Sequence, residues 1–342
     1  MSTQRAGAPV QPFAPPAARE VPRVSELLVV EQRRGEGDAS HWIREGGQTI
    51  PGRDSNLRLD ALRDGLVRHQ GVRVAVADAD DEALARILDA MHEPAYLDAL
   101  RGVDSAEPVV IPGFAPPGLE PDIPVNAGLV AAAHEGVRTA ITAAQHLAAG
   151  AQFTYAVCRP PGHHAGPDFL GGYCYLNNAA AAVRMLCEEG MKPVGILDLD
   201  LHYPNGTSAL VEQIDDATLH SLHASPVTNV SAETVLPRAD GERVVAFGAS
   251  PDADAYLEEV GASIEALAAD AAALVVSLGY DTVAGDPHGS WGFAPEIFAA
   301  IGRLLAASNL PVCVVQEGGY LLPVLAECSN AFARGLLDGS AA

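Results

Sequence analysis

The sequence alternates short apolar runs with longer alanine-rich stretches, and this pattern recurs along most of the chain. Some runs, such as 274–278 and 312–316, are apolar at almost every position, which is typical of strands covered on both faces. Strands that alternate with helices favour a mainly parallel sheet with right-handed crossovers. The pattern therefore predicts an α/β fold built around one central sheet.

The predicted elements cover most of the chain after its first residues. The predicted strands are 26–30, 72–77, 153–158, 194–198, 218–222, 243–247, 274–278 and 312–316. The predicted helices lie near 57–69, 82–91, 127–149, 177–189, 253–271, 295–307 and 322–337. Two long loops, 35–56 and 106–124, are rich in glycine or proline and could rim a pocket.

The 342 residues suffice for one large domain. Residues 1–24 are rich in alanine and proline and lack the apolar core of a secretion signal, so we expect a flexible leader before a domain over 25–342. No apolar stretch reaches the roughly 18 residues of a membrane span. The five cysteines are unclustered, which is typical of reduced thiols in a cytoplasmic protein.

The formal net charge of the chain is −23. A surface this acidic repels nucleic acid phosphates and attracts cationic ligands. The charge therefore argues against a nucleic acid partner. Many cytoplasmic proteins are acidic simply for solubility, so the charge only weakly favours a cationic substrate.

Polar motifs follow the ends of four predicted strands. In one of them, Asp198, Asp200 and His202 alternate directly after the apolar run 194–197, so an extended strand would place all three on one face. Two carboxylates and an imidazole are costly to bury unless a cation holds them. Asp281 follows another buried strand, and the carboxyl ends of parallel strands meet at one edge of a sheet.

We therefore predict Asp200, His202 and Asp281 as ligands of a divalent metal ion. On Zn²⁺, two carboxylates and one imidazole leave a position open for water. Carboxylate-rich ligation also suits other divalent ions, so the residues predict the site more sharply than the metal.

His163 and His164 lie in a loop stiffened by two prolines, and one imidazole could take a proton from water and pass it to a leaving amine. Asp198 or Asn205 could orient that imidazole through its second nitrogen. Tyr320, which follows two glycines, could donate its hydroxyl to an oxyanion, although a lone tyrosine there is more often a core or turn residue.

Read together, four segments resemble the histone deacetylase superfamily and are most similar to bacterial acetylpolyamine amidohydrolases. The segments are 159–180, 197–207, 277–287 and 317–320, with a weaker match over 92–100. No phosphate-binding loop of the Walker type and no serine nucleophile elbow compete with this interpretation.

The resemblance implies a single catalytic domain with the arginase/deacetylase fold, whose central, mostly parallel sheet has about eight strands with helices on both faces. It implies a zinc-dependent enzyme in which His164 is general base and acid, His163 is its electrostatic partner and Tyr320 polarises the acyl carbonyl. The implied zinc ligands are Asp200, His202 and Asp281.

The resemblance also implies a lined acyl tunnel and a second metal. Gly172 and Tyr173 match positions that line the tunnel. A structural K⁺ is implied on side chains and carbonyl groups near the strand ends. These implied K⁺ ligands are Asp198, Ser221 and the carbonyls of Asp200, His202 and Leu222.

The sequence departs from the family pattern in three places. Tyr203 and Pro204 replace the usual histidine and glycine after His202, and residues 224–231 replace a glycine-rich loop that normally forms a tunnel wall. His288 stands where an apolar residue commonly lines the site, so it either contacts substrate or is a rim histidine.

The first functional hypothesis is a deacetylase of a small N-acylated amine such as an acetylpolyamine, with Glu120 and Asp122 holding a distal ammonium group. A protein acetyl-lysine deacetylase, a deacylase of a natural-product intermediate and a non-catalytic binder of acylated ligands stay open. The sequence also leaves a homodimer or a homotetramer open.

Overall fold

The computed structural model describes residues 26–35, 40–45, 47–120, 123–225 and 242–340. The predicted leader at 1–24 therefore lies outside the described residues, as do Asp122 and positions 226–231 of the altered loop. No helix within the described ranges is long and apolar enough to cross a membrane.

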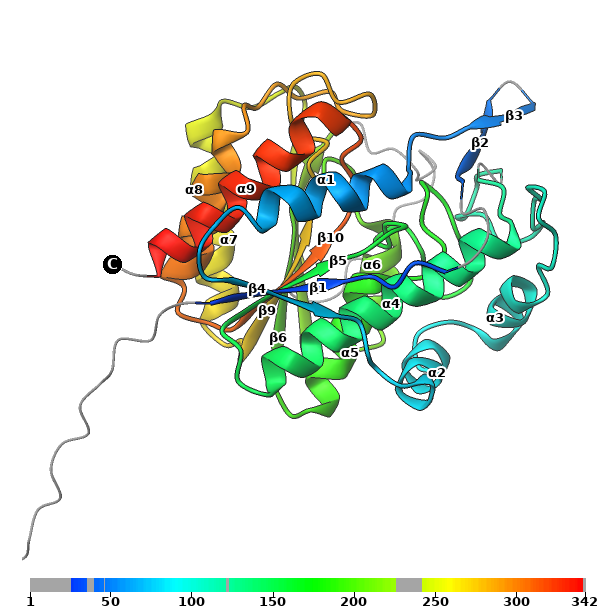
Figure 1. Ribbon diagram of the computed structural model, residues 1–342, viewed down its shortest axis with the longest axis horizontal. Helices are drawn as coiled ribbons and strands as arrows, with labels where there is room; N and C mark the ends of the chain where they lie inside the picture. The colour runs from blue at the N-terminus through cyan, green and yellow to red at the C-terminus, as the bar shows by residue number, and fades with distance from the viewer. Residues whose placement is uncertain (1–25, 36–39, 46, 121–122, 226–241, 341–342) are drawn as a thin grey trace, which may run out of the picture.

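One eight-stranded sheet organises the molecule, and all of its strand pairs are parallel (Figure 1). Its order is β4-β1-β5-β10-β9-β6-β7-β8. The strands are β1 (Leu27–Glu31), β4 (Val72–Val76), β5 (Phe153–Val157), β6 (Val194–Asp198), β7 (Ala217–Ala224), β8 (Arg243–Phe247), β9 (Ala273–Leu278) and β10 (Val312–Gln316). All eight predicted strands are present, and the predicted fold class is confirmed.

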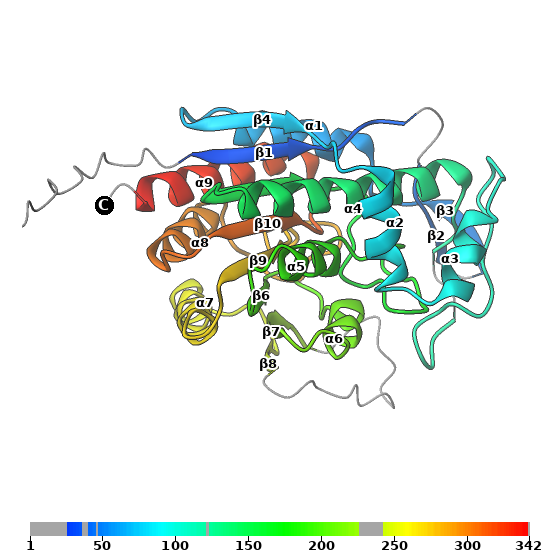
Figure 2. The ribbon, with the colours of Figure 1, turned by 90° about the horizontal axis from the view of Figure 1, so that it is seen from below.

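Helices cover both faces of the sheet (Figures 1 and 2). The helices are α1 (Asn56–Leu66), α2 (Asp81–Asp89), α3 (Pro94–Arg101), α4 (Ala127–Ala148), α5 (Asn178–Glu188), α6 (Asn205–Val211), α7 (Ala253–Ala268), α8 (Glu296–Ala307) and α9 (Leu322–Gly339). One hydrophobic core contains residues of α4 and α5, and a second contains residues of α1, α7, α8 and α9. Each central strand supplies alternate residues to the two cores, which explains its continuous apolar sequence.

Helix starts follow ordinary capping chemistry. The side chains of Asp80, Asn126 and Asn177 accept hydrogen bonds from backbone N–H groups in the first turns of α2, α4 and α5. The Asn177 cap matters most for the site, because it fixes where the chain leaves the loop that carries His163 and His164 and enters α5.

Four short elements were not predicted. A hairpin of β2 (Trp42–Glu45) and β3 (Gln48–Pro51) lies within the predicted loop 35–56, and α3 and α6 are also additional. Elements of four to eight residues carry little periodic signal.

Strand β6 has the predicted bounds 194–198, so Asp200 and His202 lie in the loop that follows it and not in the strand itself. Strand β6 ends at Asp198, where the Asp198 side chain accepts a hydrogen bond from the backbone N–H of Asp200 at 3.2 Å. The Asp200 side chain does the same for the N–H of His202 at 2.9 Å. These side-chain turns shape the start of the loop, while the backbone N–H of Leu199 still donates to the carbonyl of Ser277 in β9 at 2.9 Å.

Candidate active site

The polar motifs follow β5, β6, β9 and β10, which lie side by side in the middle of the sheet. Because these strands are parallel, their carboxyl ends meet at one edge. The loops after them bring the predicted metal ligands, the paired histidines and Tyr320 around one cavity. The cavity has a volume of about 280 Å³.

Asp200, His202 and Asp281 converge as predicted. Nδ1 of His202 lies 3.1 Å from Oδ1 of Asp200 and 3.0 Å from Oδ2 of Asp281. One potential ligand atom from each residue lies within 4.8 Å of the others. The remaining carboxylate oxygens accept backbone hydrogen bonds, at 2.9 Å from Gly318 to Asp200 and at 3.0 Å from Leu201 to Asp281.

Two glycines lie directly against the carboxylates of this cluster. A Cβ on Gly279 would lie 2.2 Å from Oδ2 of Asp200, and one on Gly318 would lie 2.7 Å from that oxygen and 2.9 Å from Oδ2 of Asp281. Glycine at both positions therefore lets the backbone approach the carboxylates closely.

The cluster fits a divalent cation. Oδ2 of Asp281 is buried and accepts no hydrogen bond of good geometry. Burial and the neighbouring Asp200 carboxylate raise the pKa of Asp281 to about 7, because together they outweigh the opposing contact with His202. A cation between Asp200, His202 and Asp281 would remove that repulsion and satisfy the orphaned oxygen.

The paired histidines have different partners. Nδ1 of His164 lies 2.6 Å from Oδ1 of Asn205, and Nδ1 of His163 lies 3.3 Å from Oδ2 of Asp198. Asn205 oxygen can only accept, so Nδ1 of His164 carries a proton and its Nε2 keeps a lone pair. Sequence reasoning named Asn205 and Asp198 as alternatives for one histidine, whereas each serves a different one.

The pKa values of His163 and His164 are also shifted in opposite directions. Burial opposes protonation of His163, but the Asp200 and Asp198 carboxylates outweigh it and raise its pKa to about 10. Burial, together with the adjacent His163 and His202, lowers the pKa of His164 well below its ordinary value. The site therefore pairs one cationic and one neutral imidazole.

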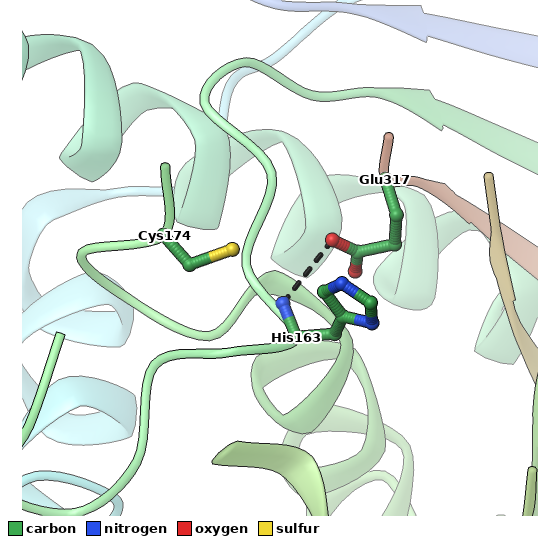
Figure 3. A group of neighbouring side chains, drawn as sticks. All are labelled: His163, Cys174 and Glu317. Atoms are coloured by element: carbon green, nitrogen blue, oxygen red, sulfur yellow. Dashed lines mark hydrogen bonds between the residues drawn. The ribbon is translucent and has the colours of Figure 1, made fainter. Parts of the chain in front are cut away.

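His163 also belongs to a buried group with Cys174 and Glu317 (Figure 3). The contact to Glu317 runs through the His163 backbone nitrogen at 3.1 Å, and the same oxygen accepts the N–H of Gly162 at 2.6 Å. Burial raises the pKa of the Cys174 thiol well above its ordinary value, so it stays protonated. We interpret this group as an anchor for the histidine loop, because its carboxylate is already engaged by backbone donors.

Tyr320 lines the same cavity as the paired histidines. Its backbone N–H donates to Oδ2 of Asp286 at 2.6 Å, and the guanidinium of Arg58 lies 4.7 Å from its ring centroid. Burial raises the pKa of its hydroxyl well above the ordinary value, so Tyr320 is a hydrogen-bond donor. Neither Arg58 nor Asp286 was singled out in the sequence.

The three residues predicted to bind substrate all line the cavity. The hydroxyl of Tyr173 accepts the N–H of Arg53 at 3.0 Å and lies 3.2 Å from Nε2 of His288. The donor in the Tyr173–His288 contact depends on which ring nitrogen of His288 carries the proton. Ile43 and Arg44 of the unpredicted hairpin complete the rim.

The residues predicted to hold K⁺ lie in adjacent strands. Asp198 of β6 pairs in register with Ser221 of β7, and Leu222 follows directly. Oγ of Ser221 lies 2.9 Å from Nδ1 of His223. Asp198 and Ser221 are fully buried, whereas Glu120, which was expected to meet a distal ammonium, is exposed and does not line the cavity.

Comparisons with known proteins agree with this geometry. The sequence model of the histone deacetylase domain matches residues 53–336. This chain belongs to the histone deacetylase family. Like other members of the family, it is a deacetylase that hydrolyses amide bonds, and the resemblance predicted from its motifs is confirmed.

Several relatives of this deacetylase are named acetylpolyamine amidohydrolases. Acetylpolyamine amidohydrolase 1 of Pseudomonas aeruginosa is 32% identical over 75% of this chain and 82% of its own length. The acetylpolyamine amidohydrolase of Mycoplana ramosa is 37% identical over 58% and 61%, respectively. The crystal structure of the acetylpolyamine aminohydrolase from Burkholderia pseudomallei matches 91% of this chain and 98% of that one, with a TM-score of 0.79 and 26% identity.

Proposed function

We propose that this deacetylase is a zinc-dependent amidohydrolase that removes an acetyl or other short acyl group from a small N-acylated amine. The observation that carries the proposal is the convergence of two buried carboxylates and an imidazole next to a neutral, oriented histidine. Asp200, His202 and Asp281 would hold the metal. When bound, zinc lowers the pKa of a coordinated water and polarises a carbonyl.

The paired histidines would move the proton. His164 presents the lone pair of Nε2 to the cavity side of the dyad, so it can accept a proton from the attacking water and return it to the leaving amine. Asn205 holds the required tautomer from the far side of the ring. His163, cationic beside Asp198, would stabilise negative charge that develops on the substrate.

Tyr320 would bind the carbonyl oxygen. Its hydroxyl stays protonated and faces the same cavity as the metal ligands, so it can donate a hydrogen bond that strengthens as the oxygen becomes negative. Gly172, Tyr173 and His288 would contact the substrate on either side of the acyl group.

The cavity supports a small substrate. Its volume of about 280 Å³ lies at the lower end of the roughly 300–1,000 Å³ typical of ligand pockets. The names of the relatives make acetylpolyamines the first compounds to test. We also propose a structural K⁺ on Asp198, Ser221 and the carbonyls of Asp200, His202 and Leu222, supported by the burial and strand register of Asp198 and Ser221.

The metal assignment is tested with Asp281→Ala. Losing one of three ligands should abolish stoichiometric zinc binding, measured by elemental analysis of protein dialysed against equimolar zinc. Asp252→Ala, at the exposed start of α7, is the control and should keep its zinc. Stoichiometric zinc in folded Asp281→Ala would contradict the assignment.

The substrate class is tested with acetylated putrescine, cadaverine and spermidine beside an acetyl-lysine peptide. We expect the zinc-loaded enzyme to favour the small amines in kcat/KM. Preference for the peptide would support a protein deacetylase instead. Zinc binding without hydrolysis of any of these compounds would support a non-catalytic binder or a deacylase for another acyl amine.

A further inference from the structure

Asp54 is a fully buried carboxylate at the start of α1, and three side chains from different parts of the chain meet it. Its Oδ1 accepts from Nη1 of Arg58 at 2.5 Å. Its Oδ2 lies 2.8 Å from Nε of Arg159 and 2.5 Å from Nδ1 of His41. The side chains of Asp54, Arg58 and His41 have no exposed surface, and that of Arg159 has 1%.

Arg58 connects this carboxylate to the loop that carries Tyr320. Its Nε donates to the carbonyl of Gly319 at 2.6 Å, and its Nη2 donates to the carbonyl of Glu317 at 2.5 Å. These carbonyls flank Gly318, whose N–H donates to Asp200. The planar guanidinium therefore fixes the loop backbone and also lies against the Tyr320 ring.

Arg159 connects the same carboxylate to the histidine loop. It precedes Pro160 and Pro161, and its Nη1 donates to Oδ1 of Asn56 at 2.9 Å. Its backbone N–H donates to Oε1 of Gln32 at 2.6 Å. Because several partners hold Arg159, it supports Oδ2 of Asp54 while Arg58 binds Oδ1.

Two buried guanidinium groups need a counterion, since an uncompensated buried charge is strongly destabilising. Among the residues that the structure describes, Asp54 is the carboxylate that contacts both. If it served only as a counterion, its removal would affect stability and leave the chemistry of the folded enzyme intact. The contacts of Arg58 with both sides of Gly318 indicate more than that.

We propose that Asp54 is a positioning residue for Tyr320: it orients Arg58, and Arg58 holds the Tyr320 hydroxyl at the carbonyl oxygen of the substrate. The inference rests on the proposed role of Tyr320. Catalysis depends on such alignment, since a displacement of about 1 Å can lower a rate by roughly a hundredfold.

The test is a double-mutant cycle between Asp54→Asn and Tyr320→Phe, with an N-trifluoroacetyl amide as substrate so that slow variants stay measurable. In the wild-type background, Asp54→Asn should lower kcat by about tenfold to a hundredfold. KM and bound zinc should change little. In the Tyr320→Phe background, the same substitution should lower kcat by less than about threefold, because the group it positions is gone.

Equal losses in the two backgrounds would overturn the proposal and leave Asp54 with a structural role, as would unchanged kcat in folded Asp54→Asn. If Asp54→Asn does not fold, Arg58→Lys decides the question, because it keeps the buried charge but cannot reach both carbonyls and the carboxylate. The same non-additivity is expected for it.

Asp60→Asn is the matched control on α1. Its carboxylate is half exposed and pairs with Arg34 at the surface, so kcat should not change. The outcome is separable from the proposed function: full activity of Tyr320→Phe alone would remove Tyr320 from the mechanism, whereas the cycle measures only the coupling to Asp54.

Discussion

Individual reactive side chains in the site are buried and oriented by a second group. His164 has Asn205 behind it, His163 has Asp198, and Tyr320 has Arg58. Each pairing limits the protonation state or the direction of the reactive group. Substitutions that keep the shape and remove one function are therefore informative at this scale.

Tyr320→Phe removes a hydroxyl and little else. We expect kcat to fall by about a hundredfold to a thousandfold, as for loss of one oxyanion donor. Bound zinc should stay stoichiometric, because the proposed ligands Asp200, His202 and Asp281 are unchanged. Steady-state kinetics with metal analysis measures both, and a wild-type kcat would exclude the proposed hydrogen bond.

The clustering of the proposed metal ligands and the paired histidines could be predicted from the sequence because each lies in the loop after a buried strand. Asp54 and Arg58 could not. Arg58 contacts Gly319, which is 261 positions away in the chain, and it lies on a helix that otherwise has an ordinary amphipathic pattern. No local spacing marks a contact of that kind.

At the scale of elements, helix contacts depend on small residues as much as on apolar ones. Gly65 of α1 lies against α9, where an added Cβ would meet Oγ of Ser329 at 2.0 Å and the carbonyl of Ala326 at 2.2 Å. Gly261 of α7 has only Leu304 nearby, at 3.8 Å. Both are helical glycines, so they form a matched pair.

Gly65→Ala should lower the free energy of unfolding by about 1–3 kcal/mol, because α1 and α9 must separate to admit the methyl group. Gly261→Ala should leave it unchanged or raise it by up to about 1 kcal/mol through helix propensity. Denaturant titration measures both. An equal effect of the two substitutions would show that the α1–α9 contact adapts without cost.

Sequence periodicity located the long elements because their apolar patterns persist. It missed the hairpin β2–β3 and helix α6, whose conformation depends on the neighbouring loops. It placed β6 correctly at 194–198, but the alternation of Asp198, Asp200 and His202 fits a strand and a series of side-chain turns equally well. Only the hydrogen bonds distinguish the two.

At the scale of the whole molecule, buried neutral histidines tie stability to pH. Burial lowers the pKa of His92 from 6.5 to about 4, although its bond to the carbonyl of Gly166 opposes this. Its Nδ1 lies 2.8 Å from that carbonyl, and its Nε2 accepts the N–H of Asn177 at 3.4 Å. Protonation would break the second contact.

His92 is therefore harder to protonate in the folded chain than in the unfolded chain. The contribution of His92 to stability is complete above pH 6.5 and falls as the pH drops toward 4. The loss is at most about 3 kcal/mol. The amide of a glutamine can make both contacts. His92→Gln should therefore weaken the dependence of the free energy of unfolding on pH over that interval.

Urea titrations of wild type and His92→Gln at several pH values test this. Parallel curves for wild type and His92→Gln between pH 6.5 and 4 would exclude His92 as a source of the acid sensitivity.

The glycines beneath the carboxylate pair have a consequence for how such an enzyme can diversify. Gly279 and Gly318 leave no room under Asp200 for even a methyl group. Substitutions that reshape the cavity must lie in the loops and the hairpin around its opening. Ancestral variants with altered substrate preferences should therefore differ at the mouth of the cavity and keep both glycines beneath Asp200.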